Sequence, residues 1–212
     1  MQEICSTILA GVFISLTGSL PLGNLNVTAT HLAAKESARS ALWFAVGAVL
    51  VEMIYLRLTL SVIDSVLLHS SLFLKLQWAT VVLLLALAAG SFWALRKPAH
   101  ESKNILIENR MNRFVLGFLM SLANPVQLPF WAGWSTYLLA QQWIAKSSFG
   151  YNLFTLAAGA GTFGAMLAFI FVGRRFADLM NRNQKPVHWI MGMLFLSMAV
   201  LQLWHLLAPI TS

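Results

Sequence analysis

Apolar residues fill six long segments of the chain, and short polar connections separate the segments. The segments extend over Ile4–Ala34, Ala41–Val62, Leu72–Leu95, Phe114–Ala140, Gly150–Gly173 and Val187–Ala208. Runs of about 20 apolar residues are typical of membrane-spanning helices, which satisfy their own backbone hydrogen bonds in lipid. The pattern therefore predicts an all-α integral membrane protein with six transmembrane helices.

A polar stretch in the middle of the chain separates two sets of three segments. We predict a single transmembrane domain over 1–212, in which repeat one covers 1–95, a cytoplasmic loop covers 96–113 and repeat two covers 114–212. Because each half crosses the membrane an odd number of times, the second half starts from the opposite side. If the halves share a fold they form two inverted three-helix repeats, an arrangement common among secondary transporters.

Helix-breaking and polar residues interrupt the first and fourth segments. The first contains Pro21 and Asn24 in the sequence SLPLGN, and the fourth contains Asn124 and Pro125 in SLANPVQLP. Proline removes a backbone donor and glycine loosens the chain, so we expect both helices to break near the midplane. Matched interruptions point to a midplane binding site in such transporters. The alternative is two simple kinks whose freed backbone groups bond to neighbouring helices.

Residues at the two interruptions form the predicted substrate-binding site. The helix that restarts after Gly23 has Asn24 in position to act as its N-cap, and its positive end would suit a carboxylate. Asn26 shares one helix face with Thr30, four residues on. The predicted substrate-binding residues are Pro21, Gly23, Asn24, Asn26, Asn124, Pro125 and Gln127.

Glu52 lies near the centre of the second segment. A carboxylate at that depth costs about 2.5–3.5 kcal/mol on insertion scales, so it should face the protein interior. Glu52 is the predicted ion-coupling residue; the alternative is a permanently protonated acid bonded between helices. Arg57 lies roughly 140° further round the helix, so it does not share a face with Glu52. It either extends toward the outer boundary or contacts substrate.

The sequence gives no indication of a metal, cofactor or nucleotide site. The five histidines show no paired spacing and Cys5 is the only cysteine, so no metal site or cofactor is expected. No glycine-rich nucleotide-binding loop is present, which excludes an ATP-driven engine in this chain. Ala157, Gly161 and Ala165 form a small-residue stripe for close helix packing, either within the molecule or across a homodimer.

Composition and charge support a membrane protein and give its orientation. Of 212 residues, 58% are hydrophobic and 10% charged, against roughly 25% charged in soluble domains. The connections after segments one, three and five hold eleven of the 14 Lys and Arg residues. The positive-inside rule places these loops in the cytoplasm and both termini outside it. The basic residues that give the net charge of +7 therefore line one membrane face, where anionic lipids attract them. Nucleic-acid binding is not expected.

The sequence resembles the LysE-type (LysE/RhtB) amino-acid exporter family over nearly its whole length. That family pairs a Pro-Gly-Pro-Asn break in its first span with a Gly-x4-acid pattern in its second and an Asn-Pro break in its fourth. The matching residues are Pro21 and Asn24, Gly47 and Glu52, and Asn124 and Pro125. The resemblance implies an inner-membrane exporter of amino acids or related small metabolites, run as a proton- or ion-coupled antiport and compatible with a homodimer. Leu22, Gly23 and Val126 depart from the family pattern, so no individual substrate is assigned.

Two other classes of function remain compatible with the sequence. A cation or metal exporter would require more carboxylates or histidines facing the cavity than Glu52 provides. A membrane anchor or partner subunit would transport nothing. An enzyme is not expected, because the sequence shows no clustered acid, base and nucleophile.

Overall fold

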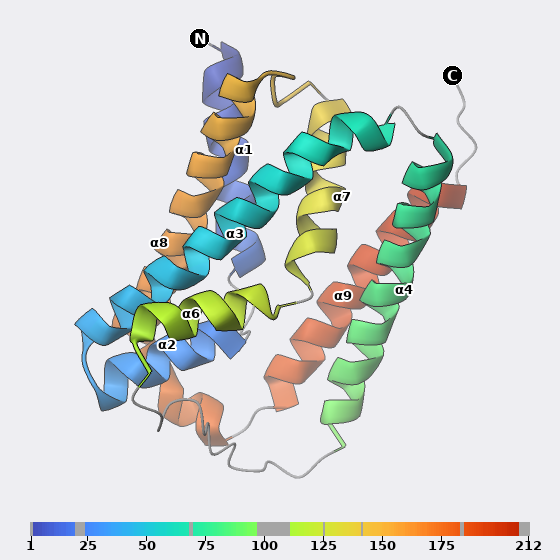
Figure 1. Cartoon of the computed structure of the whole chain (residues 1–212). Helices are drawn as coiled ribbons and strands as arrows, with labels where there is room; N and C mark the ends of the chain where they lie inside the picture. The colour runs from blue at the N-terminus through green and yellow to red at the C-terminus, as the bar shows by residue number, and fades with distance from the viewer. Residues whose placement is uncertain are drawn as a thin grey trace. The chain divides into compact units, whose positions relative to one another are not determined.

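The computed structural model describes residues 2–19, 24–67, 70–96, 111–124, 126–140, 142–182 and 185–207. Within these ranges the chain forms helices and turns without strands, which confirms the all-α prediction. The helices are α1 (Gln2–Ser19), α2 (Asn24–Lys35), α3 (Ala38–Leu67), α4 (Ser70–Ala94), α6 (Arg113–Leu122), α7 (Gln127–Ala140), α8 (Ser148–Arg182) and α9 (Lys185–Leu207) (Figure 1).

The described helices coincide with the six predicted segments. Three of them contain apolar stretches long enough to cross a bilayer, namely Ala38–Ile63 in α3, Gln77–Ala94 in α4 and Ser148–Val172 in α8. Two bent pairs, α1 with α2 and α6 with α7, each reach that length together. Helix α9 carries a shorter apolar stretch, His188–Trp204. The described part of the chain therefore contains up to five candidate spans and one shorter apolar helix.

The chain divides into two compact units. One consists of residues 65–102 and 180–212, where α4 and α9 run antiparallel and side by side (Figure 1). Gly192 of α9 allows this contact, because a Cβ placed there would lie 2.7 Å from the ring of Phe92. The other unit consists of residues 1–64 and 103–179 and contains both helix breaks.

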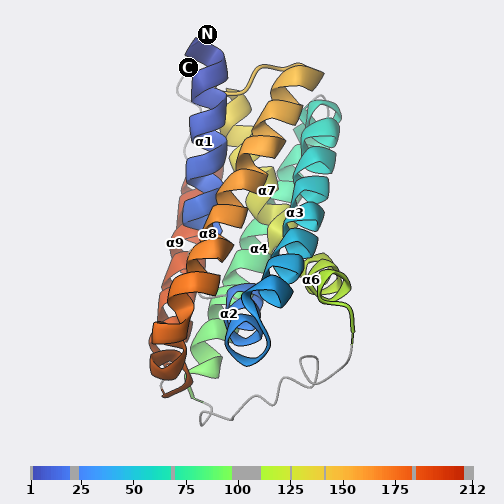
Figure 2. The same cartoon turned by 90° about the vertical axis from the view of Figure 1, so that its left-hand side faces the viewer.

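In this larger unit, α1 lies alongside α8 (Figures 1 and 2). A Cβ added to Gly161 of α8 would overlap the carbonyl group of Val12, and one added to Gly11 of α1 would crowd Ala157. The predicted small-residue stripe on α8 therefore makes a contact within the molecule. Glycine at these positions brings the two backbones together, as is common between helices in membranes.

Helices α3 and α6 cross at a second pair of glycines. A Cβ on Gly47 would overlap the carbonyl group of Phe114, and one on Gly117 would overlap that of Phe44. In both contacts the first helix of one half therefore packs against the second span of the other half. This exchange is consistent with the predicted inverted repeat.

Buried apolar side chains of the larger unit form two separate clusters. The first core contains Leu56 and Leu60 of α3 with Phe154 of α8, together with residues of α1 and α7. The second core contains Phe44 of α3 and Met166 of α8, together with residues of α2 and α6. Helices α3 and α8 each pass from one core to the other, so the middle of each helix lies between them.

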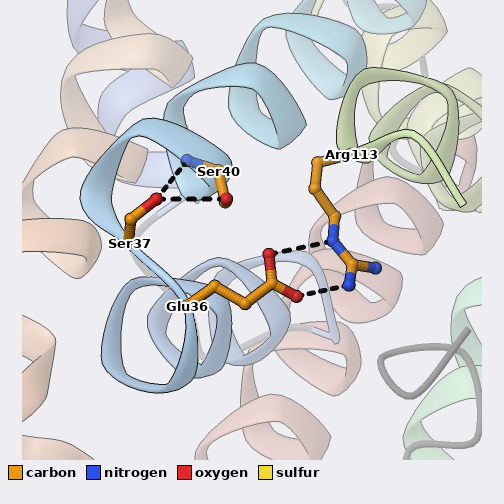
Figure 3. Close-up of polar contacts among 4 residues, drawn as sticks. All are labelled: Glu36, Ser37, Ser40 and Arg113. Carbon is orange, nitrogen blue, oxygen red and sulfur yellow. Dashed lines mark hydrogen bonds and ion pairs between the residues drawn. The ribbon is translucent and has the colours of Figure 1, made fainter. Parts of the chain in front are cut away.

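An ion pair connects the end of α2 to the start of α6. Arg113 donates from Nε to Glu36 Oε2 at 3.0 Å and from Nη2 to Oε1, a bidentate arrangement (Figure 3). A separate hydrogen bond holds the start of α1. There the Thr7 hydroxyl donates to the carbonyl oxygen of Trp143 at 2.8 Å. The start of α1 therefore lies beside the connection between α7 and α8.

Candidate functional site

The first break lies between α1 and α2, whose axes differ by 77°. The side-chain amide of Asn26 donates to the carbonyl oxygen of Ser19 at 2.6 Å, which satisfies one of the acceptors left unpaired where α1 ends. Asn24 is exposed and begins α2 itself, one position later than an N-cap. Pro21 and Gly23, both predicted site residues, lie outside the described residues.

The second break lies between α6 and α7, which are bent by 67°. Gln127 Nε2 donates to the hydroxyl of Ser121 at 2.8 Å, and that hydroxyl donates to the Ala48 carbonyl at 2.9 Å. The Tyr55 hydroxyl of α3 donates to the carbonyl oxygen of Leu122 at 2.8 Å. The Tyr55 side chain therefore satisfies one backbone acceptor that the break exposes, while Gln127 and Ser121 connect the break to α3.

Asn124 occupies the bend of the second break. Its Oδ1 accepts a hydrogen bond from the backbone N–H of Val126 at 3.2 Å, a local turn that directs the chain into α7. Pro125 lies outside the described residues. Both bends are observed where the proline-containing sequences predicted them.

The two breaks meet through the end of α1 and the start of α7. A Cβ added to Gly18 would collide with the ring of Phe130, so these two segments are in direct contact. Ser15 near the same end of α1 shares a hydrogen bond with Thr162 of α8. The hydroxyl of Ser19 donates to Thr162 Oγ1 at 3.3 Å. Thr162 thus joins α8 to the first break.

Glu52 joins α3 to the same group of residues. Its carboxyl group faces the hydroxyl of Thr162 and the indole of Trp131, a residue of α7 that is fully buried. Glu52 was predicted as a site residue from its unusual depth, but its partners were not predicted. The residues brought together here are Ser15, Ser19, Asn26, Glu52, Ser121, Gln127, Trp131 and Thr162, which we call the polar layer.

The polar layer lies at mid-depth in the spans that contribute to it. Glu52 is near the middle of the 26-residue span in α3, and Thr162 is near the middle of the 25-residue span in α8. On α3, the second-core residue Val49 precedes Glu52 and the first-core residue Leu56 follows it. Buried polar side chains at this depth are costly in lipid and mark functional sites by default.

Some buried polar atoms of α7 make no hydrogen bond within the described part of the chain. They are Gln127 Oε1, Trp131 Nε1 and Ser135 Oγ, spaced four residues apart and therefore on one helix face. Native proteins pair almost all such buried groups, because an unpaired one costs about 1–3 kcal/mol. The acceptor at Gln127 can bond to a polar group of a small solute or to water, whereas the donor at Trp131 faces the Glu52 carboxyl group.

Arg57 lies apart from the polar layer. Its Nε donates to Asn152 Oδ1 at 2.8 Å, and its guanidinium group lies over the ring of Tyr151 at 5.8 Å. Both partners are in the first two turns of α8, ten or more residues before Thr162. Arg57 therefore connects α3 to the start of α8 and does not contact Glu52.

Serine and threonine residues supply much of the site that was not predicted from the sequence. Ser15, Ser19 and Thr162 are ordinary residues in an apolar helix, and only their convergence on Glu52 distinguishes them. Trp131 makes edge contacts to the rings of Phe130 and Phe154, while its indole also faces Glu52.

Comparison with known families decides which class of protein uses this site. The profile of the family described as LysE type translocator matches residues 16–205. The chain belongs to the LysE type translocator family. The matched range contains both breaks and Glu52, so the polar layer lies almost wholly inside the family region. No curated protein and no solved structure gives a significant match.

Membership confirms the resemblance to the LysE family that the sequence motifs indicated. Members of the LysE type translocator family move solutes across membranes and are transporters rather than enzymes. Together with the long apolar helices, this identifies the chain as a multi-pass membrane exporter.

Proposed function

We propose that this LysE translocator exports amino acids or related small metabolites across the bacterial inner membrane, with the polar layer as its binding site. The observation that carries the proposal is the convergence of both helix breaks, Glu52 and Thr162 at mid-depth between two apolar cores. A membrane anchor that transports nothing does not require buried polar groups at that depth, where they are costly. A transporter needs them to replace the water lost by its solute.

The chemistry of the polar layer suits a zwitterion. Gln127 Oε1 can accept a hydrogen bond from an ammonium group, and Glu52, which the Trp131 indole faces, can carry a negative charge beside it. In this proposal the substrate carboxylate lies at the start of α2, near Asn24, where the helix dipole is positive. Asn124 and Gln127 contact the solute from the second break, where Gln127 Oε1 can accept a hydrogen bond from its ammonium group, so both halves of the chain contribute to binding.

Glu52 is the proposed coupling group. It is the one ionisable member of the polar layer, and it lies between α7 and α8, which belong to the second half, while it is itself part of the first half. Exchange of a proton at this carboxyl group would change its contacts to Thr162 and Trp131 as the halves move. We therefore propose alternating access around a fixed midplane site, a mechanism that a group shared between the two halves would support.

The basic residues support a cytoplasmic location for one end of the larger unit. Lys35, Arg39 and Arg113 lie near one another, since α2 ends and α3 and α6 begin there. The start of α1 contacts the connection at Trp143, away from these residues. With the positive-inside rule, this favours an N-terminus outside the cytoplasm.

Reconstitution in proteoliposomes tests the proposal. Vesicles would be loaded with a panel of labelled amino acids, and efflux would be measured with and without a pH gradient for the wild type and Glu52→Gln. We expect gradient-driven efflux to be lost in Glu52→Gln while exchange of labelled for unlabelled substrate continues. Transport of divalent cations alone would support a cation exporter, and no flux of any solute would support an anchor; either result overturns the proposal.

A further inference from the structure

A cavity of about 580 Å³ lies between the start of α3 and the start of α6. Arg39, Ser40 and Trp43 of α3 line one side, and Asn112, Arg113 and Val115 line the other. The residues of the polar layer do not line this cavity. A ligand bound in it would therefore occupy a site separate from the proposed transport site.

Two arginines belong to the lining of the cavity. Arg39 is exposed, and within the described part of the chain no hydrogen bond or ion pair is found for it. Arg113 forms an ion pair with Glu36 (Figure 3). Glu36 is not among the residues that line the cavity. No acidic side chain of the described residues contributes to the lining. Because the Glu36 carboxylate neutralises Arg113, Arg39 carries the uncompensated positive charge of the described lining and would attract an anion.

The cavity lies at the edge of a membrane span. Arg39 is the second residue of the apolar stretch Ala38–Ile63, which places its guanidinium group at the level of the lipid headgroups. Trp43, one turn further into the span, is 53% exposed, and Val115 on α6 is 41% exposed. Tryptophan at this level is typical of the interface between membrane and water. Apolar surface thus continues from the charged cavity toward the hydrocarbon region.

We infer that this cavity binds the headgroup of an anionic phospholipid. The phosphodiester would lie against Arg39, with the hydroxyl of Ser40 as a further donor, and an acyl chain would lie along Trp43 and Val115. Basic pockets between transmembrane helices on the cytoplasmic side recognise lipid headgroups in this way. A free phosphate ion has the same charged group, but it has no acyl chain that could contact the apolar side chains beside the cavity.

Native mass spectrometry of the detergent-purified full chain tests this inference. Phosphatidylglycerol would be titrated into the wild type, Arg39→Gln and Arg39→Lys, with phosphatidylcholine as the zwitterionic comparison. Arg96→Gln is the matched control, because Arg96 is also an exposed arginine but does not line the cavity. Inorganic phosphate in large excess would be added as a competitor.

We expect one phosphatidylglycerol to bind the wild type more tightly than phosphatidylcholine. Arg39→Gln should weaken its binding about five-fold, whereas Arg96→Gln and Arg39→Lys should leave it within about two-fold of the wild type. Equal weakening by Arg39→Gln and Arg96→Gln would show diffuse surface charge and overturn the inference. Displacement of the lipid by inorganic phosphate would overturn it too, because the cavity would then be a small-anion site.

Discussion

Gln127, the first residue of α7, donates its side-chain amide to the hydroxyl of Ser121 across the second helix break at 2.8 Å. Asn26 makes the related contact at the first break, where its amide donates to the carbonyl oxygen of Ser19 at 2.6 Å. In each case the second helix of a bent pair reaches back to a serine near the end of the first. Each bend is therefore spanned by a side-chain amide, which donates to a hydroxyl at the second break and to a backbone carbonyl at the first.

Thr162 should matter for transport more than for stability. Thr162→Val keeps the shape of the side chain but removes the hydroxyl that contacts Ser15 and Glu52. We expect transport in proteoliposomes to fall about ten-fold, the equivalent of one hydrogen bond to a charged group. Unfolding in detergent should change by less than about 1 kcal/mol.

Thr155→Val is the matched control for this substitution. Thr155 is also a buried threonine of α8, but its hydroxyl donates to the carbonyl oxygen of Tyr151 in its own helix. Its replacement should leave transport unchanged. Equal losses in both variants would contradict a specific role for Thr162.

Close packing of α3 on α6 should not tolerate a methyl group. Gly117→Ala would push its Cβ into the Phe44 carbonyl group, so we expect a loss of about 1–3 kcal/mol in the free energy of unfolding. Gly133→Ala on α7 is the control, since no atom lies within 4 Å of its added Cβ. That substitution should be neutral or stabilise the helix by up to about 1 kcal/mol. Thermal unfolding in detergent measures both, and a stable Gly117→Ala variant would contradict the crossing.

Tyr55 should stabilise the second break. Tyr55→Phe removes the donor to the Leu122 carbonyl oxygen and leaves an acceptor of the broken helix unpaired. We expect unfolding to become easier by about 1 kcal/mol. Tyr137→Phe, at an exposed tyrosine of α7, should have no such effect. Identical stabilities for the two variants would show that the break does not need this hydrogen bond.

The ion pair between Glu36 and Arg113 should give a small, salt-sensitive coupling. Both side chains are partly exposed, at 29% and 17%, so screening by solvent limits its strength. A double-mutant cycle with Glu36→Gln and Arg113→Gln should give a coupling of about 0.5–1 kcal/mol that shrinks at high salt. A coupling of zero at low salt would show that the bidentate contact does not persist in solution.

Much of the architecture can be predicted from the sequence, because membrane helices are specified locally. A run of apolar residues must become a helix in lipid, and proline-containing polar sequences interrupt it. Most helix ends therefore lie within a few residues of the predicted segments, but α3 and α8 continue further, to Leu67 and Arg182. Glu52 stood out because a carboxyl group is rare at that depth. The bends at Ser19–Asn24 and Leu122–Gln127 were predictable for the same local reasons.

The partners of these residues were not predictable from local sequence. Serine and threonine are common in membrane helices, so nothing in the sequence distinguished Thr162 from Thr155 before α1 was seen against α8. Asn26 was expected to bind substrate, yet its amide nitrogen donates a hydrogen bond to the Ser19 carbonyl oxygen. Such contacts depend on how helices distant in the sequence pack. The position of the site along the chain could therefore be predicted, but the contacts among its residues could not.

Accessibility at Gln127 tests most directly whether the polar layer is a transport site. In a Cys5→Ser background, Gln127→Cys and Leu128→Cys would be treated with a charged, membrane-impermeant thiol reagent in oriented vesicles. Leu128 is the neighbouring residue and is 48% exposed, and we expect its side chain to face lipid. We predict that the substituted position 127 is modified, and that a transported amino acid protects it, whereas position 128 does not react. A position 127 that stays unreactive under all conditions, or is never protected by substrate, would contradict a solvent-accessible binding site at mid-depth.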